Sequence, residues 1–119
     1  ERLCAVQVKT RASHGADGGW HMGVKHEKLD SPSLFYCFVD FTGPNEHNSA
    51  VFILAAPVVA HVLTVSHQTW LSQPGRGGKA RNDTTMRRLL PSYEHLGMAD
   101  YQRGWLEPYR ENWNQLSSD

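Results

Sequence analysis

The sequence has few cysteines, no surplus of charge and no long apolar run. Its two cysteines, Cys4 and Cys37, lie in apolar segments, which predicts reduced core thiols in a cytoplasmic protein and excludes a disulfide framework. Twelve basic and twelve acidic side chains leave a formal net charge of zero, so any contact with phosphate must come from a local patch. Since no apolar run approaches the length of a membrane span and no signal peptide is visible, we expect no membrane association.

What the sequence does have is an ordinary globular composition. It contains 119 residues, of which 39% are hydrophobic and 20% are charged. A chain of this length can bury a core of its own, and this composition excludes wholesale disorder. We therefore expect residues 1–119 to form a single domain.

The first half of the chain predicts strands. Leu3–Thr10 alternates in polarity, which places Gln7 and Lys9 on one face of a strand. The alternate residues are expected to enter the core, and they are Cys4, Val6 and Val8.

Three further segments continue the strand pattern. Trp20–Lys28 alternates and predicts a half-exposed strand, whereas Leu34–Phe41 and Ala50–Ala55 are apolar on both faces and predict buried strands. A polar turn over Thr42–Ser49 joins the last two. Short links predict a meander, which would give a mixed sheet of about four strands.

The second half predicts helices and a basic loop. Pro57 begins a helix that runs to about Leu71 and packs on the sheet. A loop over Pro74–Arg88 follows and ends in a helical turn capped by Asn82 or Asp83. The last helix is expected over Pro108–Leu116, and aromatic residues four apart are expected as core or interface anchors: Tyr101, Trp105, Tyr109 and Trp113. The fold class is α/β (α+β).

Gln7 and Lys9 form the most suggestive pair for chemistry. An amide oxygen can ligate Mg²⁺, and a neighbouring ammonium can activate water or stabilise the charge of a phosphoryl transition state. The same spacing also occurs in half-exposed strands whose lysine lies in water, and the two residues alone leave that alternative open.

A longer series of motifs adds to this pair. The segments AVQVKT, GGW with KHE, LFYCFVDF, VFILAAPVVAHVL with SHQTWL, and GRGGKARNDTTMR follow one another along the chain. In this order they resemble the later part of small, mostly uncharacterised bacterial proteins related to PD-(D/E)XK nucleases. The resemblance implies a restriction-endonuclease-like fold, Mg²⁺-dependent hydrolysis of nucleic acid, and catalytic roles for Gln7 and Lys9.

The chain departs from that family at its start. The family has a helix and an aspartate-bearing strand before the Gln-x-Lys strand, but only Glu1–Val6 precede Gln7 here. We expect a trimmed domain or a reading frame that begins upstream. The acidic metal ligand that the family carries on that strand is then absent from this chain, or Glu1 or another subunit supplies it.

A non-catalytic, self-associating module is the alternative function. Without the preceding helix and strand, Leu3–Thr10 would lie near a sheet edge, and exposed edges recruit partners. Two-fold association into a homodimer is the expected outcome.

Other candidate residues have two interpretations each. Asp40 ends a buried strand and is either a turn cap or a second metal ligand, and Glu27 is expected in solvent. The loop cations either hold a nucleic-acid backbone or are simply solvated, and they are Arg76, Lys79 and Arg81, followed by Arg87 and Arg88. None of the seven histidines forms a pair four residues apart on a helix. The two interpretations are a structural zinc site and histidines that lie at the surface or at the edge of the core.

Overall fold

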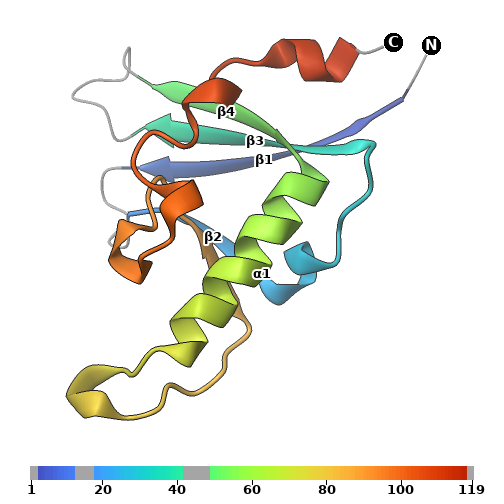
Figure 1. Ribbon diagram of the computed structural model, residues 1–119. Coiled ribbons are helices and arrows are strands. Elements are labelled where there is room, and N and C mark those ends of the chain that lie inside the picture. The colour runs from blue at the N-terminus through green and yellow to red at the C-terminus, as the bar shows by residue number, and fades with distance from the viewer. Residues whose placement is uncertain (1–2, 13–17, 42–48, 118–119) are drawn as a thin grey trace.

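The computed structural model describes residues 3–12, 18–41 and 49–117. Its main sheet has the strand order β1-β3-β4, with bounds Ala5–Ala12, Leu34–Phe41 and Ala50–Ala55. A second sheet pairs β2 (Trp20–Gly23) with β5 (Met86–Leu89). The long helix α1 (Ala56–Ser72) follows β4 directly; it starts at the end of that strand and runs obliquely away from the three strands of the main sheet (Figure 1). The predicted mixture of one main helix and a mixed sheet is confirmed.

The predicted meander is wrong, because β2 pairs with neither β1 nor β3 among the described strands. β1 pairs in parallel with β3, with Gln7 opposite Tyr36, and β3 pairs antiparallel with β4. A parallel pair needs a crossover of a dozen or more residues, which the chain between Ala12 and Leu34 supplies. β2 lies in that crossover and pairs antiparallel with the distant β5.

The segment Trp20–Lys28 is not one strand, as its alternation had predicted. Strand β2 ends at Gly23, and a 3-10 helix η1 follows over Val24–Glu27. His26 on η1 is buried at 1% exposure, and it is hydrogen-bonded to Tyr36 of β3. The turn of η1 therefore directs into the core a side chain that an extended strand would have carried past it.

The buried strands and the long helix were predicted closely. β3 and β4 have the predicted bounds, and α1 starts one residue before Pro57, which lies in its first turn. The polar threonines of α1 hydrogen-bond back to the preceding turn, where Thr64 Oγ1 donates to the Ala60 carbonyl over 2.8 Å. Thr69 Oγ1 donates in the same way to the Val65 carbonyl over 2.7 Å, so these partly buried hydroxyls are satisfied within the helix.

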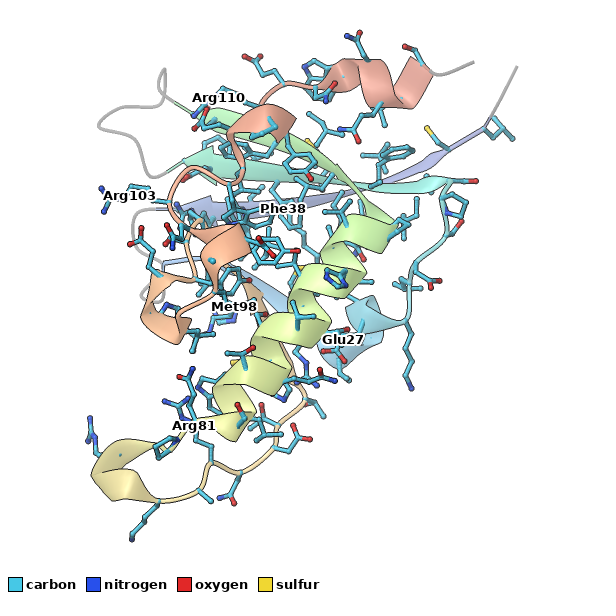
Figure 2. All side chains as sticks on the ribbon, in the orientation of Figure 1. Glu27, Phe38, Arg81, Met98, Arg103 and Arg110 are labelled. Carbon is cyan, nitrogen blue, oxygen red and sulfur yellow. The ribbon has the colours of Figure 1, made fainter. Side chains whose placement is uncertain are left out.

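The core lies between α1 and the main sheet. Tyr36 and Phe38 on β3 are fully buried there, and their rings are stacked with centroids 5.6 Å apart. Figure 2 shows Phe38 at the level of the sheet, beside α1. Trp20 joins the two sheets, because its Nε1 donates to the Val39 carbonyl over 3.1 Å and its ring lies 5.2 Å from that of Phe38.

The C-terminal third contains 3-10 turns in place of the helix predicted over Pro108–Leu116. The turns η6 (Glu107–Tyr109) and η7 (Trp113–Ser117) are separated by a bridge between Arg110 and Phe52 of β4. The backbone amide of Glu111 donates to the Val51 carbonyl over 2.8 Å. Pairing with the edge of β4 thus interrupts the helical pattern, and this segment runs alongside β4 in Figure 1.

The helical turn predicted at Asn82 or Asp83 is also wrong, because no helix starts there and β5 begins at Met86. The aromatic series forms anchors, as predicted. Trp105 contacts the rings of Tyr101 and Tyr109, with centroids 5.1 Å and 6.2 Å away. The remaining member of the series, Trp113, is 48% exposed.

Two smaller expectations can be compared with the structure. Both cysteines are free thiols; Cys37 is buried, as predicted, whereas Cys4 is only half-buried and not in the core. Within the described ranges, no helix has the length and apolarity needed to cross a membrane. Most of the turn predicted over Thr42–Ser49 lies outside the described residues, as does Glu1.

We predict that Gly19→Ala destabilises the fold. A Cβ at this position would lie 2.5 Å from the Leu89 carbonyl oxygen, so β5 would have to move. Overpacking of this kind costs about 1–3 kcal/mol in the free energy of unfolding. Gly23→Ala is the matched control, since a Cβ there meets nothing within 4 Å. Urea denaturation followed by circular dichroism measures both, and equal stability of the two variants would contradict the close approach.

Candidate functional site

Gln7 and Lys9 share the face of β1 that is turned toward the core. They are half-buried, whereas Val6 and Val8 are 44% and 59% exposed. The predicted assignment of faces is therefore reversed. The reason is the parallel register, which puts Gln7 and Lys9 beside the buried rings of Tyr36 and Phe38. A predicted row of solvent-facing polar groups is in fact at the rim of the core.

Lys9 lies close to a buried pair of titratable side chains. His26 Nδ1 and the Tyr36 hydroxyl are 2.6 Å apart and joined by a hydrogen bond. Burial lowers the pKa of His26, and the charges of Lys9 and Lys25 lower it further. Burial also raises the pKa of Tyr36, so both partners are held neutral near neutral pH. The lysine thus borders a neutral, hydrogen-bonded pair.

Asp40 is not placed to join Gln7 around one ion. Its carboxylate forms an ion pair with Arg11 over 2.8 Å, and Arg11 is its register partner on β1. Arg11 lies four positions after Gln7 on β1, which corresponds to roughly 13 Å along the strand. In the part of the chain that the structure describes, no three His, Cys, Asp or Glu side chains gather as a metal site.

Glu27 is not solvated, which corrects its predicted role. Its Oε2 atom accepts a hydrogen bond of 2.6 Å from Nε of Arg87, and the two side chains form an ion pair. The Arg87 side chain is only 7% exposed. The Nη1 atom of Arg87 also donates to the carbonyls of Thr84 and Met86. This pair ties η1 to β5, and so connects the neighbourhood of Lys9 with the second sheet.

The structure separates the three cations that were predicted to contact phosphate. Arg76 and Lys79 are exposed on the loop beyond α1. Arg81 turns back toward the helix, where its Nη1 donates to the Trp70 carbonyl over 2.7 Å and its guanidinium lies 4.9 Å from the Trp70 ring centroid. Figure 2 shows Arg81 beside the end of α1. Of the three, Arg81 lines the cavity between α1 and β5, and Arg76 and Lys79 do not.

That cavity has a volume of about 430 Å³ and lies between the second half of α1, β5 and the turn η4 (Glu94–Leu96). It combines basic and aromatic residues, which are His67, Trp70, Arg81, Arg87, Arg88, Tyr93 and His95. Of these, the sequence had grouped only the arginines. The aromatic and histidine partners lie on other elements, so spacing along the chain carried no signal for them.

Tyr93 has its hydroxyl fixed by the backbone of β5. The hydroxyl donates to the Arg88 carbonyl over 2.8 Å and accepts from the amide of Leu90 over 3.0 Å. Burial raises the pKa of Tyr93 to about 12, so it stays protonated. At the opposite side of the cavity, His67 Nε2 lies 2.7 Å from the Asp83 carboxylate and lowers the pKa of that acid.

We predict that Lys9→Ala raises the pKa of His26, because it removes a positive charge that opposes protonation of the imidazole. A pH titration followed by NMR of the His26 ring measures the shift. Lys28→Ala is the matched control, since Lys28 is exposed and does not contribute to the pKa of His26. An unchanged pKa of His26 in Lys9→Ala would contradict the placement of Lys9 close to His26.

Comparisons of the chain with protein-family models, with curated proteins and with solved structures give no significant match. The resemblance to PD-(D/E)XK nucleases therefore stays a prediction, based on the motifs of the sequence.

Proposed function

We propose that this protein acts on nucleic acid as a nuclease-like enzyme that hydrolyses phosphodiester bonds with Mg²⁺. The observation that carries the proposal is the placement of Gln7 and Lys9 side by side on the core-facing side of β1, half-buried at the rim of the core. The Gln-x-Lys resemblance adds support, and the two free cysteines fit the cytoplasm of a bacterium.

Each residue has a distinct role in this proposal. The side-chain oxygen of Gln7 would hold the ion, and the Lys9 ammonium would orient the attacking water or balance the charge of the transition state. Partial burial favours both roles, since charge interactions are stronger where water is excluded. When bound, Mg²⁺ would polarise the phosphate and lower the pKa of a coordinated water.

The donor set of the described residues fits only half of such a site. Gln7 offers one neutral oxygen, and Asp40 is paired with Arg11 too far along the strand. Mg²⁺ is reluctant to lose water and is normally held through one or two carboxylates. An acid from a second chain, or from outside the described ranges, would have to complete the site.

We expect wild-type protein to cleave DNA or RNA in Mg²⁺ or Mn²⁺, and Lys9→Ala to lower the rate about 100-fold or more, as loss of a transition-state contact does. Gel assays with end-labelled substrates measure this, and EDTA should abolish cleavage. Lys28→Ala should cleave like the wild type. Absence of cleavage by the wild type, or equal rates in the wild type and Lys9→Ala, would end the proposal.

A second candidate function is self-association through β1, because this strand is an edge of the main sheet among the described strands. The opposite edge, on β4, is partly covered by Arg110 and Glu111. β1 has no such cover in the described part of the chain, and Val6 and Val8 lie exposed on its outer face. An uncovered, partly apolar edge is a template for strand pairing.

The sequence of β1 suits a second copy of itself. An antiparallel pairing about a two-fold axis at Val8 puts Val8 opposite Val8 and Val6 opposite Thr10. The same register puts Lys9 opposite Gln7, so that no two positive charges face each other. The two Gln7–Lys9 pairs would then lie next to one another at the centre of the dimer.

We expect wild-type protein to be a dimer in light scattering, and Val8→Lys to be a monomer, because the substitution sets two ammonium groups face to face. Leu29→Lys should remain dimeric, since Leu29 is a comparably exposed apolar residue outside β1. Circular dichroism checks that both variants fold. A monomeric wild type at all workable concentrations, or a dimeric Val8→Lys, would exclude this interface.

A further inference from the structure

The cavity beside α1 has a positive lining. Arg81, Arg87 and Arg88 line it, and no Asp or Glu does so among the residues that the structure describes. Arg87 is balanced by Glu27, with which it forms its ion pair. Arg81 and Arg88 have no acidic partner in the described ranges, so their charge is available to a ligand.

Arg81 is held in place before any ligand arrives. One N–H of its guanidinium donates to the Trp70 carbonyl, and its plane lies over the Trp70 ring. These contacts leave other donors of the planar group without a described acceptor, and such a fork matches the oxygens of a phosphate. Because the side chain is already ordered, binding costs less entropy than it would with a free arginine.

Arg88 approaches the same space from β5. Its positive charge acts on the hydroxyl of Tyr93, which lines the cavity. Arg81, on the loop after α1, and Arg88, an exposed residue of β5, thus line one cavity from two separate elements. This convergence is what distinguishes the cavity from the exposed loop, where Arg76 and Lys79 have no enclosing wall.

The cavity is also larger and more apolar than an inorganic phosphate requires. Its volume of about 430 Å³ lies in the range of small-molecule sites, and Leu90, Leu96 and Met86 contribute to its lining. We infer that it binds a nucleoside monophosphate, with the phosphate on Arg81 and Arg88 and the base against the apolar wall. The unit is either a free nucleotide or the phosphorylated end of a strand.

This site is separate from the Gln7–Lys9 pair, and it needs no metal. Binding at the cavity can therefore be measured in EDTA, and Lys9→Ala should bind nucleotide like the wild type. If no hydrolysis is found, the proposed nucleotide site is unaffected. If no nucleotide binds, the proposed hydrolysis is still tested by the cleavage assay.

The test is calorimetric titration of AMP, adenosine and inorganic phosphate into the full chain in EDTA. A hexanucleotide with and without a 5′-phosphate distinguishes the strand end from the free nucleotide. We expect AMP to bind at least tenfold more tightly than adenosine or phosphate, and Arg88→Ala to weaken AMP about tenfold. Arg103→Ala is the control, since Arg103 is exposed and lies outside the cavity lining.

Arg81 supplies a second test that preserves the loop. Arg81→Lys keeps the charge but loses the planar fork, so we expect intermediate affinity, while Arg81→Ala should bind most weakly. Tighter binding of the 5′-phosphorylated hexanucleotide than of AMP would identify a strand end as the ligand, and the reverse would identify the free nucleotide. No binding of AMP at millimolar concentration, equal binding of adenosine or phosphate, or an Arg88→Ala variant that binds like Arg103→Ala would overturn the inference.

Discussion

The parallel register between β1 and β3 determines where the side chains of the candidate Gln7–Lys9 site lie. By pairing Gln7 with Tyr36 and Lys9 with Phe38, it turns the polar residues of β1 toward the side of the sheet that α1 covers. A shift of one residue would carry the valines inward and the polar row into solvent, because side chains alternate between faces. The aromatic residues of β3 favour the observed register, since they fill the space beneath the helix.

The crossover between β1 and β3 then brings the second sheet into position. Trp20 packs against Phe38, and η1 puts His26 against Tyr36, so both ends of this segment are anchored on β3. The Glu27–Arg87 pair extends that anchor to β5. A chain of contacts thus runs from Lys9, through η1, to the wall of the cavity beside α1. Breaking the buried ion pair would leave one uncompensated charge, which is usually strongly destabilising.

The parts predicted correctly are those whose pattern is decided locally. β3 and β4 are apolar on both faces, and α1 has a proline in its first turn and keeps one helical face apolar, so no distant contact had to be known. The orientation of β1 depended on its partner. Its alternation was visible, but both faces offered plausible core residues, and only pairing with β3 decided between them.

The errors in the second half have the same origin. The segment around Arg110 had a helical pattern, yet the edge of β4 provided backbone partners, and tertiary pairing overrode a weak local preference. For the candidate sites, the sequence identified Gln7, Lys9 and Arg81, because their side chains can bind a metal ion or a phosphate. It did not identify His95 or Tyr93 as neighbours of Arg81, because that proximity depends on how α1, β5 and η4 pack together.

Charge provides the last constraint on what the protein can bind. With a formal net charge of zero, the molecule as a whole offers no long-range attraction for a polyanion, so recognition must act over short distances. Three of its twelve Lys and Arg side chains form ion pairs with carboxylates among the described residues: Arg11 with Asp40, Arg87 with Glu27 and Arg110 with Glu107. Arg81 and Arg88 differ because both line one cavity, and no Asp or Glu lines it among the described residues. A ligand recognised there would be selected by the geometry of a single phosphate and its attached ring, and its affinity would depend less on salt than that of a protein that follows many phosphates along a strand.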